Sequence, residues 1–235
     1  MPLTRRATLS VAGGAVAVGV LGYLGWREFG PIPAPELPPA PPPPAPIAQA
    51  PAPVSQPPAQ MADQRKTVRS VGDPAAKVTV IEFFSLTCTH CAAFSRETMP
   101  QVEKELIQPG KVRVVYHDFP LDQVALTAAM VARYLPPERY YPFVTALFAN
   151  QDRWAFARGI NTTDELWKMA ALAGMSRTTF DQAIADNDLK SWILQQQQED
   201  QDRYKIDSTP SFVINDQKHA GEMSYDAFRK LIPDV

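Results

Sequence analysis

Apolar and polar positions along the chain change period several times. Residues 77–84 and 111–117 are runs of β-branched and aromatic side chains, which predict two buried strands. Between them, apolar positions after Cys91 recur at helical spacing, with Pro100 predicting a kink and residues 109–110 predicting the helix end. A strand, a helix and a second strand in this order predict a parallel pair with a right-handed crossover.

Residues 121–206 have a helical period instead. Amphipathic helices are predicted at 121–135, 139–150, 162–174, 176–187 and 189–204. Thr162 and Glu165 have the spacing of a capping box. A strand at 211–214, a turn at Asn215-Asp216, a short strand through Lys218 and a helix at 224–232 follow. The pattern predicts an α/β domain at residues 62–235 with a helical insertion at about 121–206.

An uncharged apolar segment lies near the start of the chain, at residues 7–26. Its 20 residues reach about 30 Å as a helix, the thickness of a bilayer's hydrocarbon core. Arg5 and Arg6 precede it, so the positive-inside bias places the N-terminus in the cytoplasm. We therefore expect residues 1–30 to be a membrane anchor or signal segment, cleaved or uncleaved, that leaves the domain across the membrane.

Prolines crowd residues 31–58, and this composition cannot build a core. At about 3.1 Å per residue, such a tract is a semi-rigid spacer with a reach of roughly 90 Å. We expect residues 31–61 to be a linker between the membrane segment and the domain. The formal net charge of −2 makes a nucleic acid an improbable partner.

The chain has two cysteines, Cys88 and Cys91, where the first predicted strand meets the helix. A helix N-terminus stabilises a thiolate, and the three-residue spacing lets the two sulfurs form a disulfide. The resulting four-residue ring restrains the unfolded chain very little, so the pair predicts redox chemistry rather than structural cross-linking. Two buried thiols or half a zinc site are the alternatives. Attachment of c-type haem is excluded, because Ala92 and not histidine follows Cys91.

The segment Phe83-Phe84-Ser85-x-x-Cys88-x-His90-Cys91 resembles the active-site segment of DsbA-like thiol:disulfide oxidoreductases, which are thioredoxin-fold proteins of the bacterial envelope. Residues 112–121 resemble the strand and loop that follow it in that family, and residues 208–214 resemble the family's cis-proline strand. The resemblance runs from about residue 71 to residue 232. It implies a thioredoxin fold into which the helical block is inserted.

By this resemblance, Cys88 is the exposed sulfur that forms a mixed disulfide with substrate, and Cys91 is its shielded partner. His90 is implied to favour the Cys88 thiolate, which makes the disulfide more oxidising. Glu82 matches the family's buried acid, which handles protons near the second sulfur. A carboxylate simply paired with a lysine is the alternative for Glu82.

The resemblance also implies a substrate-binding loop. Pro210 is expected to be cis and to lie opposite the dithiol, with the backbone of Thr209 free to pair with an extended substrate segment. Thr89 is a further candidate substrate contact, and it stands where the family's commonest oxidant has proline. This difference leaves the direction of catalysis open.

The implied function is a periplasmic enzyme, tethered to the inner membrane, that introduces disulfides into unfolded or reduced exported proteins. It would be a monomer without a metal or other cofactor, and the Cys88/Cys91 pair would be its only redox group. A quinone-linked membrane protein would reoxidise this pair. One alternative is a tethered reductase or isomerase, for example for cytochrome or copper-site assembly, that receives electrons from a membrane reductase. Another is a metal- or peptide-holding module without turnover.

Overall fold

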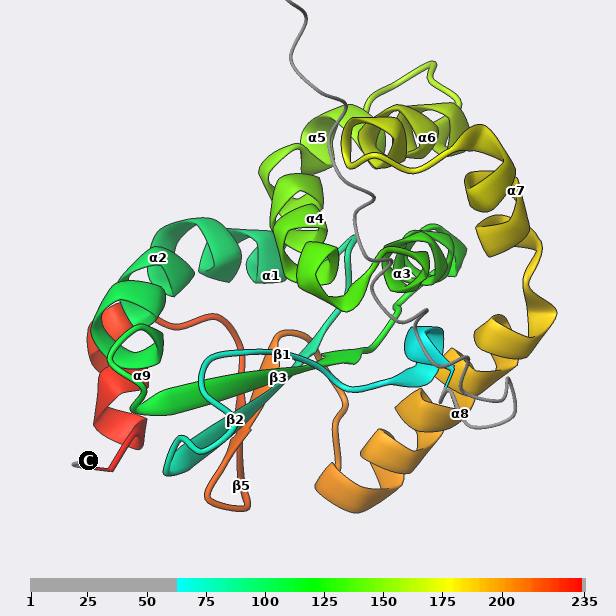
Figure 1. Ribbon diagram of the computed structural model, residues 1–235. Coiled ribbons are helices and arrows are strands. Elements are labelled where there is room, and N and C mark those ends of the chain that lie inside the picture. Colours follow the sequence, from blue (N-terminus) through cyan, green and yellow to red (C-terminus); the bar gives the residue numbers. More distant parts are fainter. Residues whose placement is uncertain (1–62, 234–235) are drawn as a thin grey trace, which may run out of the picture. The chain divides into compact units, whose positions relative to one another are not determined.

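The computed structural model describes residues 63–233, which contain a five-stranded sheet with helices packed on it (Figure 1). In sheet order the strands are β1 (Arg69–Val71), β3 (Val112–Asp118), β2 (Val78–Phe84), β4 (Ser211–Ile214) and β5 (Gln217–Ala220). Strands β2 and β3 are parallel, which confirms the predicted crossover unit, and the other neighbours are antiparallel. The turn predicted at Asn215-Asp216 joins β4 to β5, and both residues have the positive φ of a two-residue hairpin.

Two predicted segments, residues 1–30 and 31–61, lie outside the described residues. The apolar stretch at 7–26 lies there too. From Asp63 onward, none of the described helices combines the length and the apolar character that crossing a bilayer requires.

Strand β1 was not predicted. It is only three residues long, and it begins with Arg69, a residue type that seldom marks a buried strand. Yet Arg69 is 1% exposed, because its guanidinium donates to the Arg133 carbonyl at 3.1 Å and lies over the Tyr140 ring. The burial of this strand depends on partners distant in sequence, which the local pattern does not reveal.

The helix after β2 is built from four consecutive segments. They are α1 (Thr89–Ala93), η3 (Phe94–Thr98), α2 (Met99–Val102) and η4 (Glu103–Ile107). Segment η3 is a wide turn in which Met99 N–H bonds the Phe94 carbonyl, five residues back. It lies directly before Pro100, which has no N–H to donate and cannot continue a regular helix. The helix thus departs from regular α-helical hydrogen bonding next to Pro100, where a kink is predicted. It ends before the turn at 108–110, as expected.

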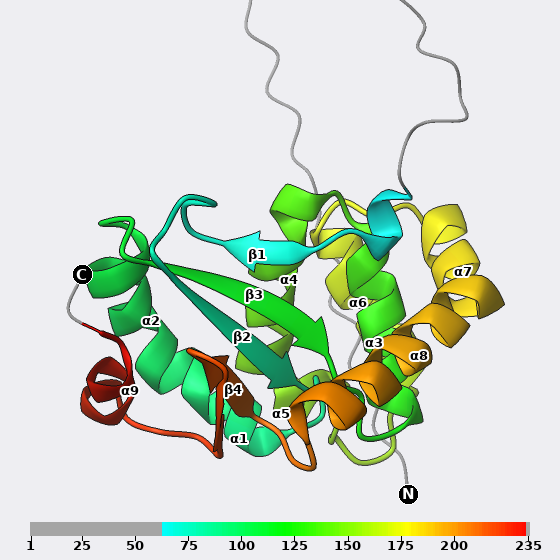
Figure 2. The ribbon, with the colours of Figure 1, turned by 90° about the horizontal axis from the view of Figure 1, so that it is seen from below.

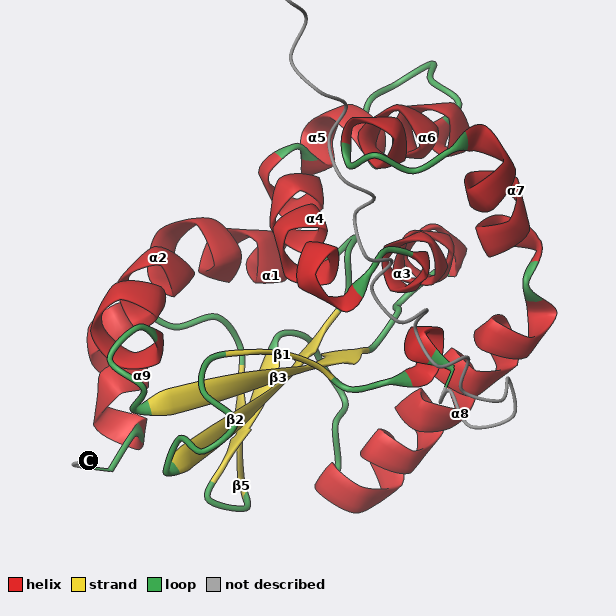
Figure 3. Ribbon diagram, in the orientation of Figure 1, coloured by secondary structure: helices red, strands yellow, loops and turns green. Residues whose placement is uncertain are grey.

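The predicted helical block is present between β3 and β4 (Figure 3). Its helices are α3 (Gln123–Tyr134), α4 (Pro137–Ala149), α5 (Gln151–Trp154), α6 (Thr162–Leu172), α7 (Arg177–Ala185) and α8 (Asn187–Tyr204). Short helix α5 was not predicted. The capping box was also wrong: Asn161 is the N-cap, and its side chain accepts the N–H groups of Thr163 and Asp164 at 3.0 and 3.3 Å. Asparagine is a strong N-cap residue, so Thr162 starts the helix proper.

The two faces of β2 have different surroundings. Val80 and Phe84 belong to the main core, with residues of the helix after β2, of α4 and of the last helix, α9 (Tyr225–Leu231). Phe83 points the other way, into a small cluster with Ile206. Because side chains alternate along a strand, Glu82 points into the main core beside Val80 and Phe84. Figure 2 shows α1, α2 and α4 behind the sheet and α8 near one end of the strands.

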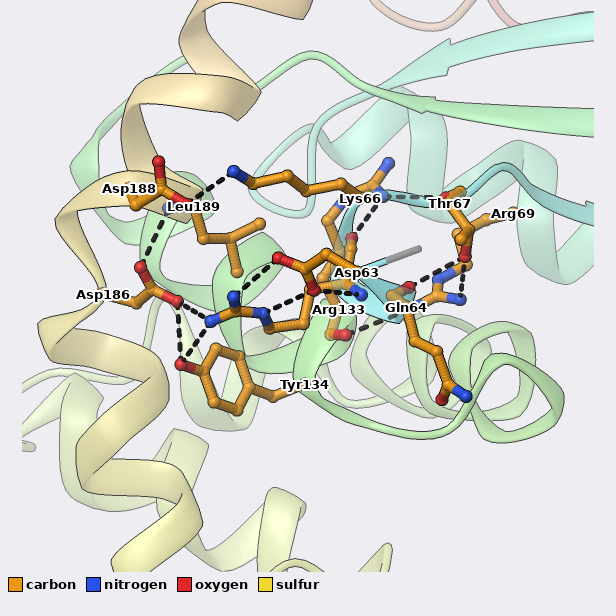
Figure 4. Close-up of polar contacts among 11 residues, drawn as sticks. Asp63, Gln64, Lys66, Thr67, Arg69, Arg133, Tyr134, Asp186, Asp188 and Leu189 are labelled. Atoms are coloured by element: carbon orange, nitrogen blue, oxygen red, sulfur yellow. Dashed lines mark hydrogen bonds and ion pairs between the residues drawn. The ribbon is translucent and has the colours of Figure 1, made fainter. Parts of the chain in front are cut away.

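Polar contacts fasten the first described residues to the helical block (Figure 4). Lys66 pairs with Asp188 at 2.5 Å, and Arg65 pairs with Asp186, which also accepts the Tyr134 hydroxyl at 2.8 Å. The segment η2 (Gln64–Lys66) is thus held against α3 and the start of α8.

Candidate active site

Cys88 and Cys91 lie at the start of α1, directly after β2 and a short loop. Cys88 is the N-cap of α1, and its sulfur accepts the backbone N–H of Cys91 at 3.3 Å. Both side chains are free thiols, and their residues are 7% and 0% exposed. The expectation of an exposed Cys88 sulfur is therefore wrong in degree, since only 7% of the residue is exposed. Cys88 remains the more accessible of the two.

The surroundings give the two sulfurs opposite acidities. Hydrogen bonding from the Cys91 side chain, with help from the backbone N–H groups of Cys91 and His90, lowers the pKa of Cys88 to about 6. Burial raises the pKa of Cys91 well above that of an ordinary thiol. At neutral pH the site is thus arranged for a thiolate on Cys88 and a protonated thiol on Cys91.

We expect Cys91→Ala to raise the pKa of Cys88, because the substitution removes the side chain that does most to stabilise the thiolate. The thiolate absorbance of the reduced protein, titrated with pH, should show a midpoint near 6 in the wild type and a clearly higher one in the variant. A Cys91→Ser variant, which keeps a donor at this position, should fall between them. An unchanged midpoint in Cys91→Ala would contradict this origin of the acidity.

The loop before β4 lies against the dithiol. The Thr209–Pro210 bond is cis, as predicted. The Cys88 thiol donates to the Thr209 carbonyl at 3.2 Å, and the Ser211 hydroxyl closes the loop by donating to the Ser208 carbonyl at 2.7 Å. The Thr209 carbonyl, which we expected to be free for a substrate strand, is therefore engaged while Cys88 is a protonated thiol, and ionisation of Cys88 to the thiolate ends this hydrogen bond.

Thr89 and His90 occupy the first turn of α1, and both are exposed beside Cys88. Nδ1 of His90 lies 3.1 Å from Oε2 of Glu222, which the sequence analysis did not single out. Glu222 follows β5, more than a hundred residues away along the chain, so no local motif connects it to the dithiol. Thr89 contacts no other side chain through a hydrogen bond among residues 63–233.

Glu82 is buried in β2, with 3% of its surface exposed. It lies opposite Tyr116 of β3 and Phe212 of β4 in the sheet register. Burial raises the pKa of its carboxyl to about 8. In the part of the chain that the structure describes, no lysine or arginine forms an ion pair with Glu82, so the lysine-paired alternative is wrong. A buried acid with a pKa near neutrality can exchange a proton with a neighbouring group.

A glutamine in the helical block holds the active-site loop in place. The Gln151 side chain, in α5, is 4% exposed and donates to the carbonyls of Leu86 and Cys88 at 2.8 and 3.1 Å. With the Thr87 hydroxyl, which donates to the α3 N-cap Asp122 at 2.6 Å, it links the inserted helices to the dithiol loop. Sequence reasoning missed it, because a lone glutamine carries no motif.

We expect Gln151→Ala to lower the free energy of unfolding by about 1–3 kcal/mol, because it removes the donor to the Leu86 carbonyl and leaves the Cys88 carbonyl with the Ala92 N–H alone. Urea unfolding of the reduced protein measures this. Gln198→Ala, at an exposed position of α8, is the matched control and should change stability by less than about 0.5 kcal/mol. Equal effects of the two variants would show that the Gln151 contacts contribute little.

Within residues 63–233, no group of three or more histidine, cysteine, aspartate or glutamate side chains is arranged to hold a metal ion.

The thioredoxin family model matches residues 64–234. A Rickettsia typhi protein, provisionally named a protein-disulfide oxidoreductase, is 26% identical over 146 residues, which are 62% of this chain and 53% of that protein. Disulfide bond formation protein D of Bacillus subtilis is 25% identical over 174 residues, covering 69% of this chain and 74% of that protein. The chain thus spans about half the length of its Rickettsia relative.

The crystal structure of alpha-DsbA1 from Wolbachia pipientis superimposes with a TM-score of 0.65 and 31% sequence identity. The match covers 71% of this chain and 89% of that one. It supports both the thioredoxin-like fold and the helical insertion predicted from the sequence. Because the family model spans most of the chain and alpha-DsbA1 is similar over most of its length, the chain belongs to the thioredoxin family, in its DsbA-like group of thiol:disulfide oxidoreductases.

Proposed function

We propose that this protein is a thiol:disulfide oxidoreductase that introduces disulfides into exported proteins through the Cys88/Cys91 pair. The observation that carries the proposal is the contrast between the two sulfurs: Cys88 caps a helix and has a pKa lowered to about 6, whereas Cys91 is fully buried and its pKa is raised. A stabilised thiolate stabilises the reduced form, and this makes the disulfide form an oxidant.

The reaction is two successive thiol–disulfide exchanges. A substrate thiolate attacks Sγ of Cys88 in the oxidised pair, so that the Cys88–Cys91 bond breaks and Cys91 leaves as a thiolate that takes up a proton. A second substrate thiolate then attacks the substrate sulfur of the mixed disulfide and releases the Cys88 thiolate. The substrate dithiol loses two electrons, and the enzyme pair gains them.

Four other residues would serve this cycle. Glu82, buried on the same side of the sheet as the helix that carries Cys91, would supply or accept the proton of Cys91. The Thr209 carbonyl, which holds the Cys88 thiol in this structure, would be released for the substrate segment once Cys88 is in a mixed disulfide. Exposed Thr89 and His90 would border the substrate beside Cys88.

The cellular setting is part of the proposal. The apolar segment at 7–26 and the proline-rich residues after it support a periplasmic domain tethered to the inner membrane. A quinone-linked membrane protein would restore the disulfide after each cycle. The name of the Bacillus subtilis relative, a disulfide bond formation protein, supports the oxidising direction.

The test uses the oxidised full chain in detergent and reduced, unfolded ribonuclease A. An oxidant should remove two substrate thiols per enzyme molecule and convert its own pair to the dithiol in the same proportion. A protein that leaves the reduced substrate unchanged, yet rearranges scrambled ribonuclease A when it is itself reduced, would be an isomerase or reductase. That result would overturn the proposed direction.

A further inference from the structure

Glu222 lies beside His90 of the active-site segment although it is remote from it in sequence. The residue before it, Gly221, donates its N–H to the carbonyl of cis-Pro210 at 2.8 Å. The residue after it, Met223, accepts the Thr98 hydroxyl at its carbonyl at 2.7 Å. One contact fastens the loop to the cis-proline segment and the other to the helix that carries the cysteines. The backbone position of Glu222 is therefore fixed relative to both halves of the site.

The side chain of Glu222 points to His90. Oε2 lies 3.1 Å from Nδ1 of His90, and the two side chains are 43% and 69% exposed. His90 is separated from Cys88 by Thr89 alone, and its backbone N–H stabilises the Cys88 thiolate. A carboxylate is thus held beside the one histidine that lies between the two cysteines.

We propose that Glu222 is a positioning residue that limits how oxidising the Cys88/Cys91 pair is, by neutralising the charge of His90 and holding its ring toward the loop after β5. The inference rests on the proposed function and names a residue that sets the reduction potential of the Cys88/Cys91 pair. An unpaired imidazolium would favour the Cys88 thiolate, whereas an imidazolium paired with a carboxylate presents almost no net charge to it.

The direction in which Glu222 affects the Cys88 thiolate follows from the charges of Glu222 and His90. With Glu222 present, the pair carries at most zero net charge, because the carboxylate contributes −1 and the imidazole at most +1. Without the carboxylate, the imidazole contributes between zero and +1. Removing Glu222 therefore makes the surroundings of Cys88 more positive, which stabilises the thiolate and with it the reduced enzyme. Both side chains are partly exposed, so the effect is screened and moderate.

The experiment compares the equilibrium of the full chain with reduced and oxidised glutathione at neutral pH, with free thiols counted after alkylation. Glu222→Gln should shift the equilibrium constant three- to tenfold toward the reduced enzyme, which is about 15–30 mV toward a less negative potential. Glu222→Asp, which keeps the charge, should shift it less. Glu97→Gln is the control, because Glu97 lines the same surface cavity but forms no ion pair with His90.

A double substitution separates this effect from a change in loop structure. In a His90→Asn background, Glu222→Gln should shift the equilibrium less than it does in the wild type, because the charge that Glu222 neutralises is gone. An equal shift in both backgrounds, or no shift in either, would overturn the inference. Failure of the proposed function would look different: the wild type itself would not oxidise reduced ribonuclease A, whatever residue stands at position 222.

Discussion

Cys88→Ser is expected to abolish disulfide transfer to reduced ribonuclease A, with a loss of at least about a thousandfold in rate, since a serine hydroxyl cannot form the mixed disulfide. Cys88 is the more accessible sulfur and the one whose thiolate is stabilised, so no other group in the described site can replace it. The fold should be retained, because serine can still cap α1. Stopped-flow oxidation of the substrate, with circular dichroism as the check on folding, makes the measurement.

Cys91→Ser should give the complementary result. With scrambled, disulfide-containing ribonuclease A, the Cys88 thiolate of this variant would attack a substrate disulfide, form a mixed disulfide and release one substrate thiol. The adduct would persist and be visible on non-reducing gels, because the Cys91 thiol that would attack Sγ of Cys88 and release the substrate is gone. A protein that merely holds peptides or a metal would bind its partner equally well with serine at position 91 and would form no adduct. Residual transfer by Cys88→Ser, or absence of an adduct in Cys91→Ser, would contradict the assigned roles.

Glu82→Gln is expected to have the second largest effect, on the pH dependence of stability. Burial raises the pKa of this carboxyl from 4.5 to about 8 on folding, so between these pH values the folded state binds more protons than the unfolded state. The free energy of unfolding contributed by Glu82 is therefore lost as the pH rises through this window. Glutamine stays neutral throughout and mimics the protonated acid.

The difference in unfolding free energy between Glu82→Gln and the wild type should grow in favour of the variant by about 3–5 kcal/mol between pH 4.5 and pH 8. A change in unfolding free energy that the buried glutamine amide causes equally at every pH does not alter this growth. Urea unfolding at several pH values measures it, and Glu105→Gln, at an exposed position of η4 beside Lys104, should show almost no growth. If the unfolding free energies of Glu82→Gln and the wild type changed with pH in parallel, Glu82 would not be buried as a neutral acid.

Much of the fold was predictable, because its signals are local. Strands β2 and β3 consist of β-branched and aromatic residues, and the helices between Gln123 and Tyr204 keep a regular period, so the local pattern and the tertiary structure agree. Strand β1 and helix α5 were missed because each is too short to show a period, and the burial of Arg69 depends on distant partners.

The residues of the candidate site are likewise of two kinds, those in short sequence motifs and those that packing brings to the site. The two cysteines, His90 and the cis peptide at Pro210 belong to short motifs, so their places could be expected from sequence. Gln151 and Glu222 lie far from those motifs, and only the packing of α5 and of the loop after β5 brings them to the dithiol. The contact between the Cys88 sulfur and the Thr209 carbonyl also depends on packing, because the two residues are 121 positions apart along the chain.

The reduction potential of the Cys88/Cys91 pair tests the central claim most directly. The full chain would be equilibrated with glutathione buffers of graded composition, and the free thiols would then be alkylated and counted. A stabilised Cys88 thiolate and an oxidising role predict a potential near that of strong dithiol oxidants, about −120 mV. A potential at or below about −200 mV would contradict that role and assign the pair to reduction or isomerisation.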